Sequence, residues 1–253
     1  MDYWRLIYLN EFDGYMQMAI DEAMLILRSK NKIPNTLRFF VFKPSAITIG
    51  YFQSMIDEVN LDFCKKKGIS VVRRITGGGA VFHDENGEIT YSIVVTEREA
   101  PKDIIRSYEL YCKGLIIALK KLGLTAEFKP VNDVLVFGKK ISGSAQTRKR
   151  GVVLQHGTFM YNTDIGTLAV ALKIVPEKLK DKGVSKLEER VITVSKALGR
   201  EISRDEVLQA LIEGFKEALN VKFIEEKLTQ EELKLAKKLA EEKYSRDEWN
   251  FMV

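Results

Sequence analysis

The sequence predicts a single α/β or α+β domain that starts with a helix, continues through short strands and a second long helix, and ends in a run of helices. Residues 15–162 alternate helical and β-type patterns, and residues from about 164 onward carry helix start signals. No internal repeat and no Pro/Gly-rich linker divides the chain. The chain has 253 residues, which is long enough to bury a sizeable core. With 45% hydrophobic residues, its composition is too polar for a membrane protein.

The elements follow from spacing and boundary residues. Met16, Ile20, Ala23 and Leu27 recur at helical spacing, which predicts an amphipathic helix over 15–31. Pro101 and Gly123 bound a second predicted helix. Runs rich in β-branched and aromatic residues predict strands at 36–42, 46–53, 69–75 and 88–96, and a strand pair at 132–146 and 151–162.

The C-terminal third carries capping-box spacing, in which a hydroxyl residue is followed three positions later by glutamate. Ser185, Ser203 and Thr229 each have this spacing and predict three helix starts. The final "KYSRDEWNFMV" contains three aromatic residues, which need a surface to bury them. Either this segment folds back on the domain or it meets a partner.

Charge and cysteine usage narrow the class of protein. The net charge of +5 is a modest excess of 40 basic over 35 acidic residues, which favours solubility or an acidic partner and does not specifically indicate nucleic acid. Cys64 and Cys112 lie far apart without metal-ligand spacing, which is typical of buried thiols in a reducing compartment. The start "MDYWRLIYLNEFDG" lacks a signal pattern, and no run of 18 apolar residues occurs, so we expect a cytoplasmic protein.

Only two histidines, His83 and His156, are present, so a His-rich metal site is excluded. The sequence contains no GxSxG, HExxH or GxxxxGK[ST] motif. An enzyme with this sequence is therefore not expected to supply its own nucleophile.

The stretch "RRITGGGAVFHD", residues 73–84, reads as a strand, a bare loop and a second strand. Three glycines in a row can be a flexible turn without function. Glycine also lets main-chain amides approach an anion closely, and a neighbouring arginine can clasp a carboxylate or phosphate. The combination predicts a pocket for an acyl phosphate or a nucleotide, without the helix-opening glycine pattern of a Rossmann site.

A second constellation is "NDVLVFGKKISGSAQ", residues 132–146, followed by "LQHG". Lys139 fits a solvated hairpin lysine. Lys140 is expected on the opposite face, beside residues small enough to leave a cavity, where its ammonium group would offer a positive charge to a reacting carboxylate or phosphate. Asn132 and Asp133 either begin a turn or, in the case of Asp133, hold Mg²⁺ against ATP phosphates.

Together, "RRITGGGAVFHD", "NDVLVFGKKISGSAQ" and "QHGT" resemble the lipoate–protein ligases, relatives of the biotin ligases, and the resemblance extends from "AIDEAML" to "KYSRDEWNF". The resemblance implies a mixed central sheet with flanking helices, as in class II aminoacyl-tRNA synthetases. It also implies that lipoate and ATP give lipoyl-AMP with Mg²⁺ as activator. A lysine of an acceptor lipoyl domain, in 2-oxoacid dehydrogenase complexes or in the glycine cleavage H protein, then takes the acyl group.

The resemblance also implies roles for individual residues. Lys140 matches the family's catalytic lysine, which contacts the reacting carboxylate and the acyl-phosphate oxygens. Asp133 matches the Mg²⁺ region, while His156 could equally be a satisfied core histidine. The implied lipoate-binding residues are Arg73, Arg74, Gly77, Gly78, Gly79, His83, His156 and Gly157, and the implied ATP-binding residues are Val81, Phe82, Asp84, Asn132, Asp133 and Lys140.

Two departures from the family pattern shape the expectation. Many members continue into a small C-terminal domain after a segment such as "KYSRDEWNF", so residues 1–253 are expected to be one catalytic domain that needs a separate small accessory protein, with Tyr244, Trp249 and Phe251 near the contact. The sister octanoyltransferases carry a cysteine shortly before the motif lysine, and residues 123–140 contain none. We therefore expect an ATP-dependent ligase, with a carrier-protein-dependent octanoyltransferase or a non-catalytic binder of lipoate or nucleotide as alternatives.

Overall fold

A mixed sheet of eight strands forms the centre of the computed structural model, which describes residues 3–174 and 180–252. The strand order is β11-β1-β2-β6-β10-β9-β8-β7, with β1 parallel to both of its neighbours and antiparallel pairing from β2 onward. The strands are β1 (Tyr3–Phe12), β2 (Thr36–Phe42), β6 (Glu88–Thr96), β7 (Ala126–Lys129), β8 (Asp133–Val136), β9 (Lys139–Lys149), β10 (Val152–Met160) and β11 (Lys222–Glu225).

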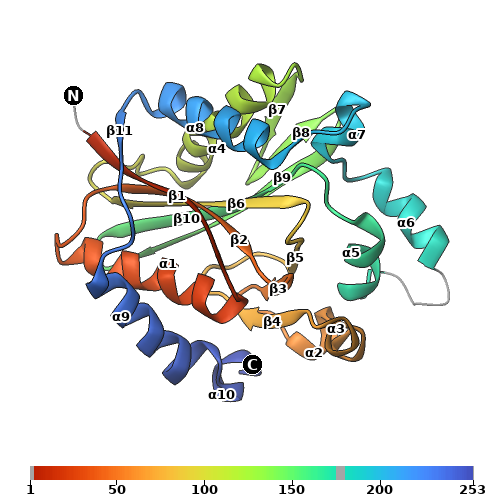
Figure 1. Ribbon diagram of the computed structural model, residues 1–253, viewed down its shortest axis with the longest axis horizontal. Coiled ribbons are helices and arrows are strands. Elements are labelled where there is room, and N and C mark those ends of the chain that lie inside the picture. Colours follow the sequence, from red (N-terminus) through yellow and green to blue (C-terminus); the bar gives the residue numbers. More distant parts are fainter. Residues whose placement is uncertain (1–2, 175–179, 253) are drawn as a thin grey trace.

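Helices cover both faces of this sheet (Figure 1). On one face, α4 (Ile104–Lys121) and α8 (Arg204–Leu219) pack together over a core that includes Phe39, Tyr91 and Phe215. On the other, α1 (Gly14–Ser29) packs beside α9 (Gln230–Leu239) over a second core. The arrangement buries both faces of the central strands, which explains why β2 is buried along its whole length.

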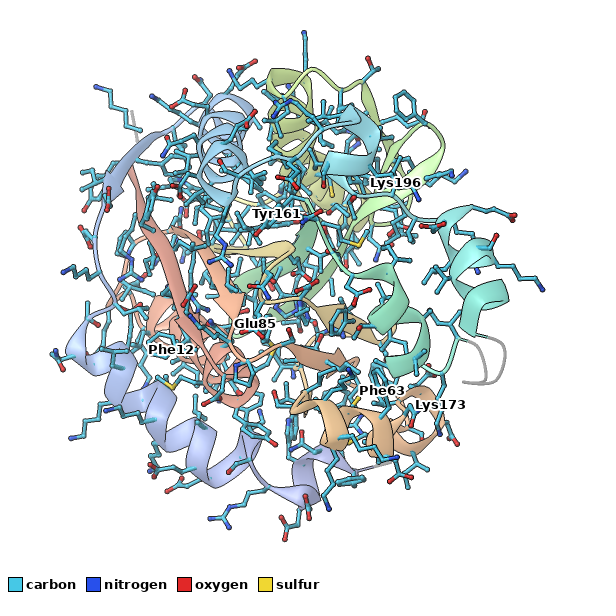
Figure 2. All side chains as sticks on the ribbon, turned by 45° about the vertical axis from the view of Figure 1, so that its right-hand side comes forward. Phe12, Phe63, Glu85, Tyr161, Lys173 and Lys196 are labelled. Carbon is cyan, nitrogen blue, oxygen red and sulfur yellow. The ribbon has the colours of Figure 1, made fainter. Side chains whose placement is uncertain are left out.

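A small three-stranded sheet stands beside the large one. Its order is β4-β3-β5, formed by β3 (Ala46–Ile49), β4 (Ser70–Arg73) and β5 (Val81–His83). It is covered by α2 (Met55–Glu58), α3 (Leu61–Lys67), α5 (Ile165–Ala171) and α6 (Lys180–Glu188). In Figure 2, Phe63 of α3 lies near Lys173, just beyond α5, and the Asn60 amide donates to the Ala171 carbonyl at 2.9 Å. The glycine run connects β4 to β5, the two outer strands of this sheet.

The C-terminal segment folds back on the domain. After α9 come a short π-helix, η2 (Ala240–Tyr244), and α10 (Asp247–Asn250). Tyr244 is fully buried and donates a hydrogen bond from its hydroxyl to Glu22 at 2.6 Å, while Phe251 remains 46% exposed. Most of the aromatic surface of this segment is therefore buried against the chain itself, which bears out the first of the two possibilities drawn from the sequence.

The predicted fold class is confirmed, and several element predictions need correction. Thr229 and Glu232 form the complete capping box of α9, and Ser203 caps α8. Ser185 lies inside α6 and does not begin a helix. Residues 132–146, predicted as one strand, form the hairpin of β8 and β9, because Phe137 and Gly138 adopt positive φ in a tight turn. In residues 3–174 and 180–252, no helix has the length and apolarity needed to cross a membrane.

Candidate active site

A cavity of about 670 Å³ opens between the small sheet and the β6, β8, β9 and β10 region of the large sheet. Most of its surface is apolar, with Met18, Phe42, Leu135, Met160 and Leu168 among the residues that line it. This size and character are typical of a small-molecule site. Of the predicted site residues, the cavity is lined by Arg74, Gly78, Gly79, Val81, Phe82, His83, Asn132, Asp133, Lys140, His156 and Gly157.

The glycine run forms one wall of this cavity. Gly78 has φ +94°, a conformation that side chains with a Cβ adopt only under strain. The Gly78 carbonyl packs so closely on Gly50 that a Cβ at position 50 would lie 1.9 Å from its oxygen. The bare backbone predicted from the sequence is thus used both for an unusual conformation and for close approach between two loops.

Arg74 holds the glycine run from inside. The residue is 3% exposed, and its guanidinium donates hydrogen bonds to the Gly77 and Gly79 carbonyls at 2.7 and 2.8 Å and to the Thr76 hydroxyl at 3.0 Å. Burial lowers the pKa of Arg74 to about 10, so the side chain stays charged at neutral pH. A buried positive charge beside the cavity favours a ligand that carries a partial or full negative charge.

Arg73, predicted to contact the ligand, lies elsewhere. Its side chain is fully buried and donates to main-chain carbonyls, among them those of Gly50, Gln53 and Asn250. Arg73 is the last residue of β4 and Arg74 follows it, and of the two only Arg74 lines the cavity. Gly77 and Asp84 are likewise outside the lining, and the Asp84 carboxylate accepts from the Asn86 and Asp164 amides at 2.9 and 2.8 Å.

Lys140 stands where the cavity meets solvent, with 40% of its side chain exposed. Its ammonium nitrogen lies 2.7 Å from a carboxylate oxygen of Asp133, which belongs to the facing strand β8 but pairs in register with Gly143, whereas Lys140 pairs with Leu135. The main chain of Lys140 is fixed by bonds to the Arg190 carbonyl and the Ile192 amide at 2.8 and 2.9 Å. The neighbouring Lys139 instead donates to the Glu188 carbonyl at 2.6 Å, and only Lys140 of the two lines the cavity.

His156 reaches the cavity from β10 and is held by two buried partners. Its Nδ1 lies 2.9 Å from Asp21 and its Nε2 lies 2.8 Å from the Thr76 hydroxyl. Burial lowers the pKa of His156, and the nearby Arg74 lowers it further, while Asp21 opposes the shift. We infer a neutral imidazole at pH 7 that connects the glycine run to α1 through Thr76 and Asp21.

His83 has a parallel arrangement on β5. Its Nδ1 lies 3.0 Å from Glu88 and its Nε2 lies 3.0 Å from the Thr48 hydroxyl, and the ring stacks on Phe42 at a centroid distance of 4.0 Å. Both predicted histidines are therefore cavity-lining and hydrogen-bonded. The core-histidine reading of His156 and its site reading are compatible, because the residue is buried and at the cavity wall.

The sequence reasoning missed the buried carboxylates behind the two imidazoles. Asp21 is 1% exposed and also pairs with Arg38 at 3.0 Å, and Glu88 is 2% exposed. A signal for Asp21 existed, because it follows Ile20 on the buried side of a predicted amphipathic helix, where a charge requires a partner. For Glu88, at the first position of a strand, the sequence offered no comparable signal.

The predicted contact of Asp133 with Mg²⁺ and ATP phosphates stays a prediction. Within the described ranges, no group of three or more His, Cys, Asp or Glu side chains is placed to hold a metal ion. Asp133, the residue predicted for this role, forms its ion pair with Lys140. The residues present do not fit a protein-held cation, and we derive no step through one.

The fold is that of the lipoate and biotin ligases, and a cavity suited to a small molecule opens between its two sheets. The chain belongs to the lipoyl protein ligase A/B catalytic domain family, whose model matches residues 13–216. The predicted family is therefore confirmed. A biotin protein ligase from Aquifex aeolicus, 17% identical with a TM-score of 0.50, shares the fold.

Relatives within the family fall into two named activities. The chain is 36% identical to octanoyltransferase LipM of Brevibacillus brevis and 33% identical to that of Bacillus subtilis, over 98–99% of each chain. Among solved structures it resembles a bi-partite lipoate protein ligase of Thermoplasma acidophilum, with TM-score 0.87, 36% identity and coverage of 99% and 97% of the two chains. It also resembles a lipoate-protein ligase A bound with ATP, with TM-score 0.85, 34% identity and 99% coverage of both chains.

These relatives correct the predicted activity. The expectation of an ATP-dependent lipoate ligase that acts as the large subunit with an accessory protein is contradicted, because the curated full-length relatives, at 32–36% identity, are octanoyltransferases. The chain is an enzyme of the lipoate and octanoate transfer family. The prediction went wrong because it gave decisive weight to a missing cysteine, whereas the full-length similarity is to enzymes named as transferases.

Proposed function

We propose that this protein is an octanoyltransferase, which moves an octanoyl group from a carrier-protein thioester to a lysine of an acceptor lipoyl domain. The observation that carries the proposal is the similarity to octanoyltransferases over 98–99% of the chain. The apolar cavity supports it, because an eight-carbon chain is recognised by apolar surface. A lipoyl domain as acceptor is supported by the bi-partite relative, which is described as part of a lipoylation system together with its E2 lipoyl domain.

The reaction proposed at the cavity mouth transfers the octanoyl group from the sulfur of the carrier-protein thioester to the nitrogen of the acceptor lysine. The ε-amino nitrogen of the acceptor attacks the thioester carbonyl, a carbon–nitrogen bond forms, and the carbon–sulfur bond breaks. The proton lost by the amine goes to the departing thiolate. The carbonyl oxygen becomes negative in the transition state, and we assign its stabilisation to the Lys140 ammonium group, which lines the cavity and is 40% exposed.

We propose that the transfer is direct and that neither cysteine of the chain carries the acyl group. Cys64 and Cys112 are 1% and 0% exposed. Burial raises their pKa values to about 11 and about 12, so both remain neutral thiols rather than nucleophilic thiolates. Neither cysteine is among the residues that line the cavity, and the Cys112 sulfur lies 3.7 Å from the hydroxyl of Ser144, which does line it.

The test compares two acyl sources on one acceptor. An apo lipoyl domain is incubated with the protein and octanoyl-carrier protein in one tube, and with the protein, octanoate, ATP and Mg²⁺ in another, and its intact mass is measured. We expect a mass increase of one octanoyl group with the carrier protein alone. Modification of the lipoyl domain only in the tube with octanoate and ATP would overturn the proposal. An unmodified lipoyl domain in both tubes would also overturn it.

A further inference from the structure

The C-terminal segment makes a specific contact with the strand that leads into the glycine run. The Trp249 indole nitrogen donates to the Arg73 carbonyl at 2.9 Å, and the Arg73 amide donates to the side-chain oxygen of Asn250 at 2.8 Å. The Arg73 guanidinium donates back to the carbonyls of Trp249 and Asn250 at 3.0 and 2.9 Å. These two segments lie about 176 positions apart in the chain and are joined by four hydrogen bonds.

Asn250 is itself locked in place. It is 4% exposed, and its side-chain nitrogen donates to the Tyr244 and Arg246 carbonyls at 2.8 and 3.1 Å. Its three side-chain hydrogen bonds use one acceptor and two donors, a pattern that aspartate or alanine cannot reproduce. The residue therefore fixes the geometry between α10 and Arg73 and does more than fill space.

Arg73 passes this constraint to a second loop. Its Nη1 donates to the carbonyls of Gly50, Tyr51 and Gln53 at 3.1, 2.8 and 2.7 Å, which gathers residues 50–53 around one charged group. The Trp249 ring also packs edge-on against Tyr51, with centroids 5.8 Å apart. The turn at 50–53 thus takes its shape from side chains that come from the end of the chain.

The turn at residues 50–53 supports the cavity wall. The Tyr51 amide donates to the Thr76 carbonyl at 2.9 Å, and Gly50 packs against the Gly78 carbonyl with no room for a Cβ. Gly78 lines the cavity, and Thr76 bonds His156. An unbroken set of contacts therefore leads from Asn250 through Arg73 and the 50–53 turn to the glycine wall.

We propose that Trp249 and Asn250 are positioning residues for the glycine-lined wall, acting through Arg73 to set how the cavity holds its acyl ligand. The inference rests on the proposed function for the identity of that ligand. Neither residue lines the cavity, so their effect on the acyl group passes through residues 50–53 and 76–79. Loosening this wall should weaken acyl binding more than it slows the transfer step, because Lys140 lies on a separate hairpin.

The test uses two substitutions of different severity and a neighbouring control. Asn250→Ala removes three side-chain hydrogen bonds, whereas Trp249→Phe removes only the indole donor and keeps an aromatic ring. Phe251→Ala is the control, because Phe251 is 46% exposed and adjacent in sequence. Each full-length variant is assayed for octanoyl transfer, for thermal unfolding, and for amide hydrogen exchange of the peptide that spans residues 74–80.

We expect KM for octanoyl-carrier protein to rise about tenfold in Asn250→Ala and less in Trp249→Phe. In both variants kcat should change by less than about threefold, which is far below the roughly hundredfold loss of rate that a misplaced reacting group can cause. Faster exchange at residues 74–80 should accompany it in both variants and be absent in Phe251→Ala. Unchanged KM and exchange in Trp249→Phe and Asn250→Ala, with only a lower unfolding temperature, would overturn the inference. Because exchange is read without substrate, it decides the positioning role even if the octanoyl assay is silent.

Discussion

Replacing Lys140 by alanine tests the electrostatic role at the cavity mouth. Two unit charges about 4 Å apart interact by about 4 kcal/mol at an effective dielectric constant of 20. Lys140 is 40% exposed and already shares its charge with Asp133 at 2.7 Å, and both factors reduce the stabilisation available to a developing oxyanion. About 2.7 kcal/mol, the lower end of the range for one oxyanion donor, corresponds to a loss of about a hundredfold in the transfer rate.

The matched control is Lys139→Ala, one position away on the same strand. Lys139 donates to the Glu188 carbonyl and lies outside the cavity lining, so its removal should leave the transfer rate within about threefold. The assay is single-turnover octanoyl transfer to an apo lipoyl domain at saturating carrier protein, with unfolding temperatures measured in parallel. Equal rates for the two variants would refute the assignment of Lys140, provided that both are folded.

Three further predictions follow from the geometry. The double variant Cys64→Ala/Cys112→Ala should keep the octanoyl transfer rate within about threefold, because both thiols are buried and neutral, and mass spectrometry of the wild-type enzyme should show no acylated form. Loss of transfer in a folded double variant would instead show that a cysteine takes part in the reaction. Gly78→Ala should cost about 1–2 kcal/mol in urea unfolding because its φ is +94°, whereas Gly77→Ala, which meets open space, should cost less; equal costs would contradict the strain argument. Burial lowers the pKa of His156, so His156 is protonated at a higher pH in the unfolded chain than in the folded chain, and the free energy of unfolding falls as pH drops below about 6.5 until the folded pKa is passed. In unfolding experiments at several pH values, His156→Gln should lose less stability over this range. An unchanged pH dependence in the variant would argue against a neutral imidazole.

Local signals predicted much of the fold because they depend on neighbours in sequence. The helix starts at Ser203 and Thr229 were readable, since a capping side chain acts within three residues. The same spacing at Ser185 was misleading, because the helix there begins earlier and a capping pattern does not exclude a helical interior. Strand β1 was not predicted, since its pairing with β2 and β11 depends on segments far along the chain.

At the site, the sequence identified the motifs that line the cavity but not which residues of each motif face it. The predicted strand 69–75 included both Arg73 and Arg74, and alternation along it would have placed them on opposite faces, although the observed strand β4 ends at Arg73. What the outward residue contacts could not be predicted, because Trp249 and Asn250 belong to a segment that reads as a tail. Long-range contacts of this kind carry no mark in local sequence.

The correction of the predicted activity has a physical reason. In the proposed reaction, the Lys140 ammonium group stabilises a developing negative charge on an acyl carbonyl, and that charge arises whether the leaving group is AMP or a thiolate. The same cavity features therefore suit either acyl donor and do not distinguish between them. The absence of a cysteine from residues 123–140 concerns the number of steps in the reaction, since an acceptor amine can attack a thioester directly. Direct attack requires only that the acceptor lysine and the thioester meet beside Lys140, and the exposed position of that side chain at the mouth of the cavity leaves access for both.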